Sequence, residues 1–557
     1  MKKLTLLIAA LVLSFTAQAT IVNCSPNKNA ISWWMTQGDT LVFADGEYTE
    51  DYSIDFNQAG VVLMAAEGAK PVIKNSSYFK IHATTTFIGI TFDGQNTSNY
   101  ALTTRGEAAK DLILTNCDFR NYIKYNIEIN ENTTLTTLNI ENCVFDGTST
   151  TPVAIYGKGI VTQTTIQDSE FKNYTEYCIY ANDYYGARYD NLTINNCLFH
   201  DCAYSAVFLA KAKDGLEKQS CSDFKLTNST IYNVGAASTT GRGVVELRTN
   251  SNITSDQEVL IDHVTLYNFA SSDNAWSGGF YIGNSANTVI SNCIAMNPED
   301  KKTLHANPYH AYTGAKITNS LYFNCDYNAD HGATTTDLLK ADPMFVDAAN
   351  ADFMLYAESP AVGAGTDDSN LGDPRWGVKA GIQPGEGKLK AAVDAAQPGE
   401  TIELGDETYE VSSSIDFDVE GLTIKAAEGT KPIIKTTDQW TELKISASTT
   451  FEGITFDGGD LTKVSVSTFG TTTQTLTLKN CEFKNYTDCN VNIASETSIN
   501  TIAIENCVFD GGASTPNAIY SKGIATTCTI EDTEFKNYTT HSSTTLTALI
   551  AAGITPV

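Results

Sequence analysis

A short motif recurs along the chain and constrains its fold more than any other feature. Each copy contains an aliphatic residue, a polar residue, Asn, then Cys or Ser, any residue and usually an aromatic residue, as in Leu114–Phe119 and Ile140–Phe145. Further copies begin at Ile166, Ile194, Leu226, Ile261, Ile290 and Ile317, so that successive copies start 26 to 35 residues apart. A unit of this length cannot bury a core alone, whereas stacked units form a solenoid.

The pattern within each copy is typical of β-strands, because apolar and polar residues alternate and Thr, Ile, Val, Phe and Tyr are frequent. The Asn tolerates the left-handed backbone of a sharp bend. We therefore predict an all-β fold, a right-handed parallel β-helix (solenoid) of about three strands per coil, with coils about 4.8 Å apart.

The recurring positions are expected to form ladders from coil to coil. An asparagine ladder would contain Asn116, Asn142, Asn196, Asn228, Asn292 and Asn319, with Asp168 and His263 as substitutions that serve the turn. The cysteines that follow (Cys117, Cys143, Cys197 and Cys293) are interpreted as small buried apolar groups rather than as bridges or metal ligands.

A longer repeat indicates internal duplication. Residues 87–174 match residues 451–538 at a constant offset of 364, and the match ends at Thr539. We expect one complete parallel β-helix over residues 20–376, a linker over 377–387, a truncated duplicate over 388–539 that opens with a short helix, and a non-repeat tail over 540–557. The open end of the second copy would leave strand edges through which two chains can self-associate.

Residues 1–19 read as a signal peptide, with two lysines, an apolar run and an Ala17-Gln18-Ala19 cleavage site. Asn23 precedes Cys24 where a lipobox requires a small residue, so we expect a secreted or periplasmic protein. No later apolar stretch is long enough to span a membrane. The net charge of −29 argues against nucleic acid as a partner.

The stretch Leu389–Leu404 resembles the opening segment of pectin-lyase-like β-helix proteins. Asp342–Phe345 and Ser359–Gly365 resemble the ends of chondroitinase-B/alginate-lyase-like chains and of uncharacterised exported Bacteroidetes β-helix proteins. The resemblance implies a carbohydrate-active protein with a polysaccharide, in particular an acidic one, along one outer sheet. It also implies β-elimination by a Lys or Arg base, with Ca²⁺ or other cations neutralising the uronate carboxylate. The sequence leaves the metal unknown.

The best cluster for this chemistry is Arg242–Arg248, in which Glu246 and Arg248 face outward if Val245 and Leu247 face inward. Positive charge is needed where proton abstraction builds negative charge. The candidate catalytic residues are Lys211, Glu246 and Arg248, and the candidate substrate-binding residues are Tyr180, Phe208, Arg242, Tyr281 and Tyr312.

Two alternatives stay open. Glu246 and Arg248 also fit a surface ion pair, the aromatic residues also fit an external stacking ladder, and Ser251 stands where the related lyases carry a lysine. The protein is then either a possible polysaccharide lyase or a non-catalytic surface or adhesion solenoid that binds glycan or protein. Because the chain is acidic, any uronate substrate requires a local cationic patch.

Overall fold

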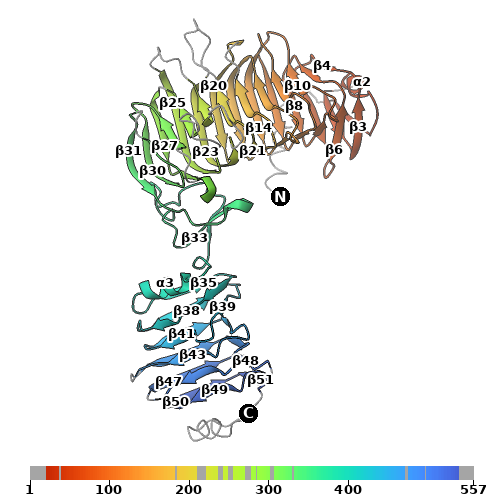
Figure 1. Cartoon of the computed structure of the whole chain (residues 1–557). Helices are drawn as coiled ribbons and strands as arrows, with labels where there is room; N and C mark the ends of the chain where they lie inside the picture. The colour runs from red at the N-terminus through yellow and green to blue at the C-terminus, as the bar shows by residue number, and fades with distance from the viewer. Residues whose placement is uncertain are drawn as a thin grey trace. The chain divides into compact units, whose positions relative to one another are not determined.

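The computed structural model describes residues 20–36, 39–181, 185–209, 221–235, 243–248, 255–269, 278–283, 285–301, 306–328, 332–470, 474–495, 497–512 and 514–538. Nearly all regular structure in these ranges is β-strand, and the strands that form the walls of the coils pair in parallel with the strand one coil away. The prediction of an all-β parallel solenoid is confirmed (Figure 1).

The chain divides into two compact units. The first comprises Met1–Pro343, Asp347–Phe353 and Pro360–Gly377, and the second comprises Met344–Val346, Met354–Ser359 and Val378–Val557. Each unit has its own apolar core within the described residues. The two units are therefore treated as separate bodies below.

Each coil of the first unit has three walls, as one coil illustrates. Strand β13 (Tyr125–Ile129) forms the first wall, β14 (Thr134–Glu141) the second and β15 (Val144–Asp146) the third. The next coil repeats this order with β16 (Val153–Gly157), β17 (Ile160–Gln167) and β18 (Glu170–Lys172), each in register with its predecessor.

The first walls form a ten-stranded sheet within the described residues. Its other strands are β4 (Ile54–Phe56), β7 (Phe79–Ile81), β10 (Tyr100–Thr104), β19 (Tyr177–Ala181), β22 (Ser205–Leu209), β24 (Gly243–Leu247), β26 (Gly278–Ile282) and β29 (Asn307–Ala311).

The second and third walls join in a 21-stranded sheet. Its other strands are β1 (Ile21–Cys24), β2 (Thr40–Phe43), β3 (Gly46–Glu50), β5 (Val61–Ala65), β6 (Pro71–Asn75), β8 (Thr85–Ile88), β9 (Thr91–Asp93), β11 (Lys110–Thr115), β12 (Asp118–Arg120), β20 (Arg188–Asn195), β21 (Leu198–Cys202), β23 (Cys221–Val234), β25 (Ser255–Tyr267), β27 (Ser285–Ser291), β28 (Ile294–Met296), β30 (Lys316–Phe323) and β31 (Thr334–Lys340). The remaining elements up to the second unit's coils are α2 (Ile31–Met35), η2 (Glu299–Lys301), β32 (Phe345–Asp347), η3 (Ala348–Asn350), β33 (Asp352–Tyr356) and β34 (Val378–Lys379).

The turn between the second and third walls explains the sequence motif. The motif residue at this turn has a left-handed backbone in every coil that carries the motif, with φ of 54° at Asn116, 51° at Asn142 and 52° at His263. Side chains of neighbouring coils bond to one another here, since the Asn142 amide donates to Asn116 and the Asn196 amide to Asp168. The expected structural role of His263 is confirmed, because its ring contacts Asp262 and Ser369.

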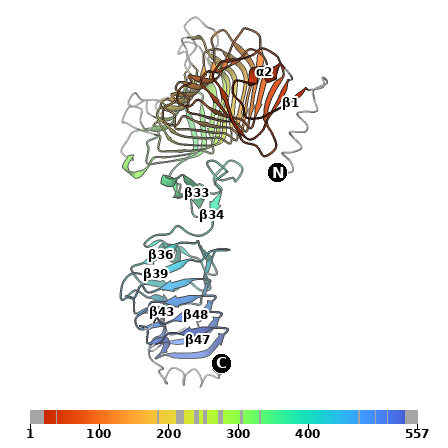
Figure 2. The ribbon, with the colours of Figure 1, turned by 90° about the vertical axis from the view of Figure 1, so that its right-hand side faces the viewer.

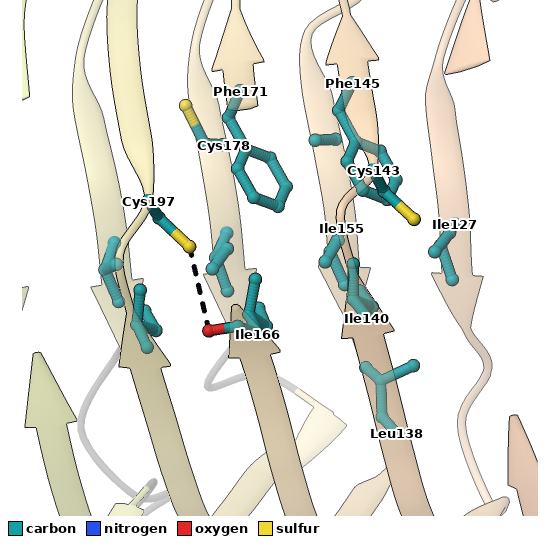
Figure 3. Packing of buried hydrophobic residues seen from close by; sticks show 14 of the residues in the cluster. Ile127, Leu138, Ile140, Cys143, Phe145, Ile155, Ile166, Phe171, Cys178 and Cys197 are labelled. Carbon is teal, nitrogen blue, oxygen red and sulfur yellow. Dashed lines mark hydrogen bonds between the residues drawn. The ribbon is translucent and has the colours of Figure 1, made fainter. Parts of the chain in front are cut away.

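The interior of the first unit is a ladder of identical side chains. Phe92, Phe119, Phe145, Phe171 and Phe199 stack with ring centroids 4.6 to 5.0 Å apart. The thiol of Cys197 lies 3.7 Å from the Ile166 carbonyl oxygen (Figure 3). All 13 cysteines are buried, and for Cys117, Cys143, Cys197 and Cys293 this confirms the interpretation as small core groups.

The second unit opens with helix α3 (Lys388–Ala395), which buries Leu389 and Val393, as the helical spacing predicted. Its three sheets repeat the coil order (Figure 2). They comprise β35 (Thr401–Leu404), β38 (Leu422–Ala426), β41 (Thr449–Glu452), β44 (Thr475–Lys479), β47 (Ser498–Glu505) and β50 (Ile524–Glu531); β36 (Thr408–Val411), β39 (Ile433–Thr436), β42 (Thr455–Asp457), β45 (Glu482–Lys484), β48 (Val508–Asp510) and β51 (Glu534–Lys536); and β37 (Ile415–Phe417), β40 (Leu443–Ile445), β43 (Val464–Thr468), β46 (Cys489–Ile493) and β49 (Asn517–Ser521).

Residues 364–376, here called the closing segment, return along the turns of the first unit. The Asn319 amide donates to the Ala364 carbonyl oxygen, the Thr366 N–H donates to Asn292, and Ser369 contacts His263. Further on, the Arg375 guanidinium donates to the Asn196 side chain at 3.0 Å. The closing segment therefore contacts the turns in the reverse of their sequence order.

Within the described residues, no helix combines the length and the apolar character needed to cross a membrane.

Candidate functional site

The outer face of the ten-stranded sheet carries one aromatic ring on each of six successive coils. These rings, here called the aromatic row, belong to Tyr78, Tyr100, Tyr125, Tyr156, Tyr180 and Phe208. Successive ring centroids lie 5.5, 5.6, 4.4, 5.4 and 5.4 Å apart. Tyr156, Tyr180 and Phe208 are register partners on neighbouring parallel strands, whereas Tyr125 pairs with Val153 and stands three positions earlier on its strand than Tyr156 does.

The rings of the aromatic row pack mainly on one another. The planes of Tyr100 and Tyr125 differ by 20°, and those of Tyr156 and Tyr180 by 21°. The planes of Tyr78 and Tyr100 differ by 72° and those of Tyr180 and Phe208 by 49°, so only part of the row is stacked. Burial first, and then Tyr100 and Glu128, raise the pKa of Tyr125 to about 12, so its phenol keeps its proton at neutral pH.

Two members of the row are themselves buried in an apolar cluster on this face. Val153, Tyr156, Tyr177 and Phe208 form a buried cluster that is distinct from the interior core, and Tyr125, Tyr180 and Tyr204 pack against it. Tyr177 stacks on Tyr180 with centroids 4.7 Å apart. An ordered aromatic surface of this kind presents its polar edges in fixed positions.

Cationic side chains lie over several rings of the row. The charged atoms of Lys80, Lys124, Lys158 and Arg248 lie 6.0, 6.0, 5.0 and 5.1 Å from the centroids of Tyr78, Tyr100, Tyr156 and Phe208, respectively. Cation–π attraction favours these positions. Three of these cations are paired with carboxylates: Lys80 with Asp55, Lys158 with Glu128 and Arg248 with Glu246.

Glu246 and Arg248 lie at the end of the row. Val245 and Leu247 enter the core, and Glu246 is the register partner of Phe208 on one side and of Tyr281 on the other. The Glu246 side chain is only 3% exposed, because it accepts hydrogen bonds from the Gly243 N–H and the Arg248 guanidinium. The Arg248 side chain is 42% exposed, so its charge is accessible to a ligand.

Beyond Glu246, the face continues with a second aromatic group. The hydroxyls of Tyr281 and Tyr312 lie 3.1 Å apart, and the Tyr281 ring lies 4.5 Å from the ring of His310. Burial first, and then the bond with Tyr312, raise the pKa of Tyr281 well above its usual value.

The structure thus places six of the eight candidate residues on one face: Tyr180, Phe208, Glu246, Arg248, Tyr281 and Tyr312. The other two, Lys211 and Arg242, lie outside the described residues. Sequence reasoning missed Tyr78, Tyr100, Tyr125 and Tyr156, although an aromatic residue at or near one strand of each coil was a usable signal.

The Ca²⁺ ion implied by the family resemblance does not fit the described residues around Glu246. Calcium takes six to eight oxygen ligands. Both carboxylate oxygens of Glu246 already accept hydrogen bonds, one from Gly243 and one from Arg248. Within the described part of the chain, no group of three or more His, Cys, Asp or Glu side chains is arranged to hold a metal.

Comparison with known proteins gives a fold-level match. Residues 104–265 match the family model described as a right handed beta helix region, and residues 259–376 match a domain of unknown function, DUF5123. No curated protein matches the chain.

Solved structures with this architecture include the PL6-family alginate lyase AlyGC (14% identity, 93% of this chain and 85% of that chain, TM-score 0.31). They also include the pectate lyase Pel9A (14% identity, 63% and 95%, TM-score 0.34) and the catalytic unit of the GH87 α-1,3-glucanase from Streptomyces thermodiastaticus strain HF3-3 (9%, 90% and 64%, TM-score 0.23). At these levels, the similarity concerns the architecture and not the activity. With the parallel coils described above, the match over residues 104–265 identifies a right-handed parallel β-helix, the fold of the pectin-lyase-like superfamily that the sequence resembles.

Proposed function

We propose that this chain is an exported, carbohydrate-active protein that binds an acidic polysaccharide along the aromatic row. The observation that carries the proposal is the row itself, with one ring per coil over six coils and cations above four of the rings. Fold alone does not support this function, so the argument depends on the surface.

The extent of the row favours a polymer over a small molecule. Five strand spacings separate Tyr78 from Phe208, which corresponds to about 24 Å. Repeating phenol groups and ring edges match the repeating hydroxyls of a sugar chain, because Tyr both donates and accepts hydrogen bonds.

The cations favour an acidic polymer. The overall charge of −29 repels polyanions at a distance, so binding requires local positive groups. Lys124 is exposed beside Tyr100, and Arg248 is exposed beside Phe208. A uronate chain laid along the row would bring its carboxylates past these side chains.

Cleavage by β-elimination is a second candidate function, favoured by the Arg248 cation at the end of the row. The guanidinium would neutralise the uronate carboxylate while a base removes the neighbouring proton. Arg248 is itself a poor base, since its guanidinium stays protonated. Lys211, which precedes Arg248 in the sequence and lies outside the described residues, is the residue we propose for this step.

The test uses the full chain with alginate, chondroitin sulfate and pectate, each with and without Ca²⁺. Binding is measured by calorimetry, and cleavage by the absorbance of new unsaturated ends. Tyr180→Ala should weaken binding about tenfold, whereas Tyr520→Ala is the control for loss of a tyrosine from the corresponding sheet of the second unit. Equal affinity of wild type and Tyr180→Ala would contradict the proposal that the aromatic row binds the polysaccharide. Binding without new absorbance would leave the non-catalytic solenoid as the function.

Export is tested separately. Protein recovered from the periplasm or medium should begin at Thr20, which N-terminal sequencing shows directly.

A further inference from the structure

A buried carboxylate lies beneath the aromatic row at the coil of Tyr125. Glu128 on β13 is the register partner of Tyr156 and is only 2% exposed. One carboxylate oxygen accepts a hydrogen bond from the Thr103 hydroxyl at 2.8 Å, and the other accepts one from the Lys158 ammonium at 2.8 Å. The Arg105 guanidinium lies 3.8 Å from the same carboxylate.

The cluster of Arg105, Glu128 and Lys158 carries more positive than negative charge. Arg105 and Lys158 face one carboxylate, which leaves a net charge of about +1 at the surface. The Arg105 and Lys158 side chains are 28% and 19% exposed, so both cations reach solvent, whereas Glu128 does not.

Lys158 is also fixed in position. Its ammonium lies 5.0 Å from the Tyr156 centroid and 5.3 Å from that of Tyr185, in addition to its bond with Glu128. A lysine held in this way loses little further freedom when it binds a ligand, which is the usual advantage of a preorganised site. An ammonium has three donors, and the Glu128 carboxylate accepts from one of them.

The second unit offers an internal comparison at the offset of 364 residues. Ser467, Asn492 and Tyr520 occupy the register positions of Thr103, Glu128 and Tyr156, and the Asn492 amide donates to Ser467 at 3.0 Å. Lys522 again lies over the tyrosine ring, at 5.3 Å.

Two charged positions differ between the units. Asn492 replaces the carboxylate, and Phe469 stands where the first unit has Arg105. The charged trio of Arg105, Glu128 and Lys158 is therefore not a requirement of the coil, since the same walls form without it. Its presence in the first unit calls for a functional reason.

We propose that Arg105 and Lys158 form a subsite for an anionic sugar substituent, a uronate carboxylate in the first instance, at the second to fourth coils of the aromatic row, towards its Tyr78 end. This inference rests on the proposed function and extends it. Arg248 lies near the other end, and four strand spacings separate Glu128 from Glu246, or about 19 Å. An acidic chain bound along the row would therefore meet a cation at two separated points.

The experiment compares polygalacturonate with fully methyl-esterified pectin, which has the same backbone without the charge, and with dextran sulfate and dextran. The full chain is tested as wild type, Arg105→Phe, Lys158→Gln and the matched control Lys522→Gln. Arg105→Phe introduces the residue that the second unit already has in this position, so the variant is expected to fold, which circular dichroism and thermal melting check.

Arg105→Phe and Lys158→Gln should each weaken polygalacturonate binding about tenfold or more, because each removes a charge-assisted contact. Both should leave binding of the esterified polymer unchanged, and Lys522→Gln should change neither. The same losses with dextran sulfate, and none with polygalacturonate, would assign the subsite to sulfate. Wild-type affinity of both folded variants for every acidic polymer would overturn the subsite alone. A wild type that binds neither charged nor esterified polymer would overturn the proposed function together with it.

Discussion

The guanidinium of Arg248 lies 5.1 Å from the centre of the Phe208 ring and also donates to the carboxylate of Glu246. One cation thus joins the last ring of the aromatic row to a carboxylate that is almost fully buried. The two contacts have different consequences, since the first positions the cation for a ligand and the second compensates a buried charge.

We predict that Arg248→Gln lowers the free energy of unfolding by about 1 to 3 kcal/mol, because the buried carboxylate of Glu246 loses the charge-assisted bond from the Arg248 guanidinium. The double variant with Glu246→Gln should regain most of that loss. Urea denaturation of the two single variants and the double variant measures the coupling. A double variant no more stable than Arg248→Gln would contradict the argument.

A second prediction concerns pH and the imidazole of His200, which contacts Glu170 at 2.8 Å and Asp201 at 2.7 Å. Burial lowers the pKa of His200, but the two carboxylates raise it by more, to about 9 from 6.5. The bond from His200, offset in part by burial, lowers the pKa of Glu170 to about 2 from 4.5.

The stabilisation from the charged His200 is therefore complete below pH 6.5 and is lost as the pH rises through 9. That from Glu170 is complete above pH 4.5 and is lost as the pH falls through 2. We expect His200→Gln to lower the free energy of unfolding by on the order of 2 kcal/mol near pH 6, and by much less at pH 10. Denaturation of both proteins at the two pH values tests this, and an equal deficit at both would refute it.

The turn residue Asn142 gives a third prediction. Its φ is 51°, and its amide donates to Asn116 in the coil before. Ala at this position should lower the free energy of unfolding by about 2 kcal/mol, because it adds left-handed strain to the loss of the bond. Gly should cost less than Ala, since it adopts this backbone freely. Urea melts of the two variants give the order, and Ala as the milder change would contradict it.

The fourth prediction concerns the thiols of Cys178 and Cys202, whose sulfur atoms lie 2.9 Å apart in the core. Cys178 is on β19 and Cys202 is on β21, so a bond between them would join two walls of the coil stack. Refolding with oxidised glutathione should form this disulfide, and the two thiol hydrogens leave with the two molecules of reduced glutathione that are released.

Mass spectrometry of peptides prepared without reductant should find the 178–202 pair linked. Cys197 serves as the control, because its thiol contacts the carbonyl oxygens of Ile166 and Asn195 and should stay free. Recovery of Cys178 and Cys202 as free thiols after the same treatment would show that the pair does not oxidise.

The fold could be predicted because its determinants are local and repeated. Each coil needs one residue that accepts a left-handed bend, and the Asn of the motif marks that position, as at Asn116. The position two residues before the bend is aliphatic and the one three residues after it is aromatic, so the core ladder that includes Phe119 was visible as well.

The site was only partly predictable because its residues have no fixed spacing. Tyr125 and Tyr156 are 31 residues apart, whereas Tyr156 and Tyr180 are 24 apart, since the loops between walls differ in length and Tyr156 stands three positions further along its strand than Tyr125 does. In the sequence, Glu128 looks like an ordinary polar residue of a strand, and the residues around it do not predict that its carboxylate is buried. Only its comparison with Asn492 in the second unit marks it as unusual.

The closing segment affects how the first unit comes apart. A stack of coils ordinarily frays from its ends, since each coil contacts only its neighbours. Here Ala364 is hydrogen-bonded to the turn at Asn319, and Arg375 to the turn at Asn196. The closing segment therefore spans several coils. The last coil cannot unfold without disrupting the closing segment, which is also hydrogen-bonded to coils much earlier in the sequence. The coils that the closing segment contacts should therefore unfold as one cooperative unit.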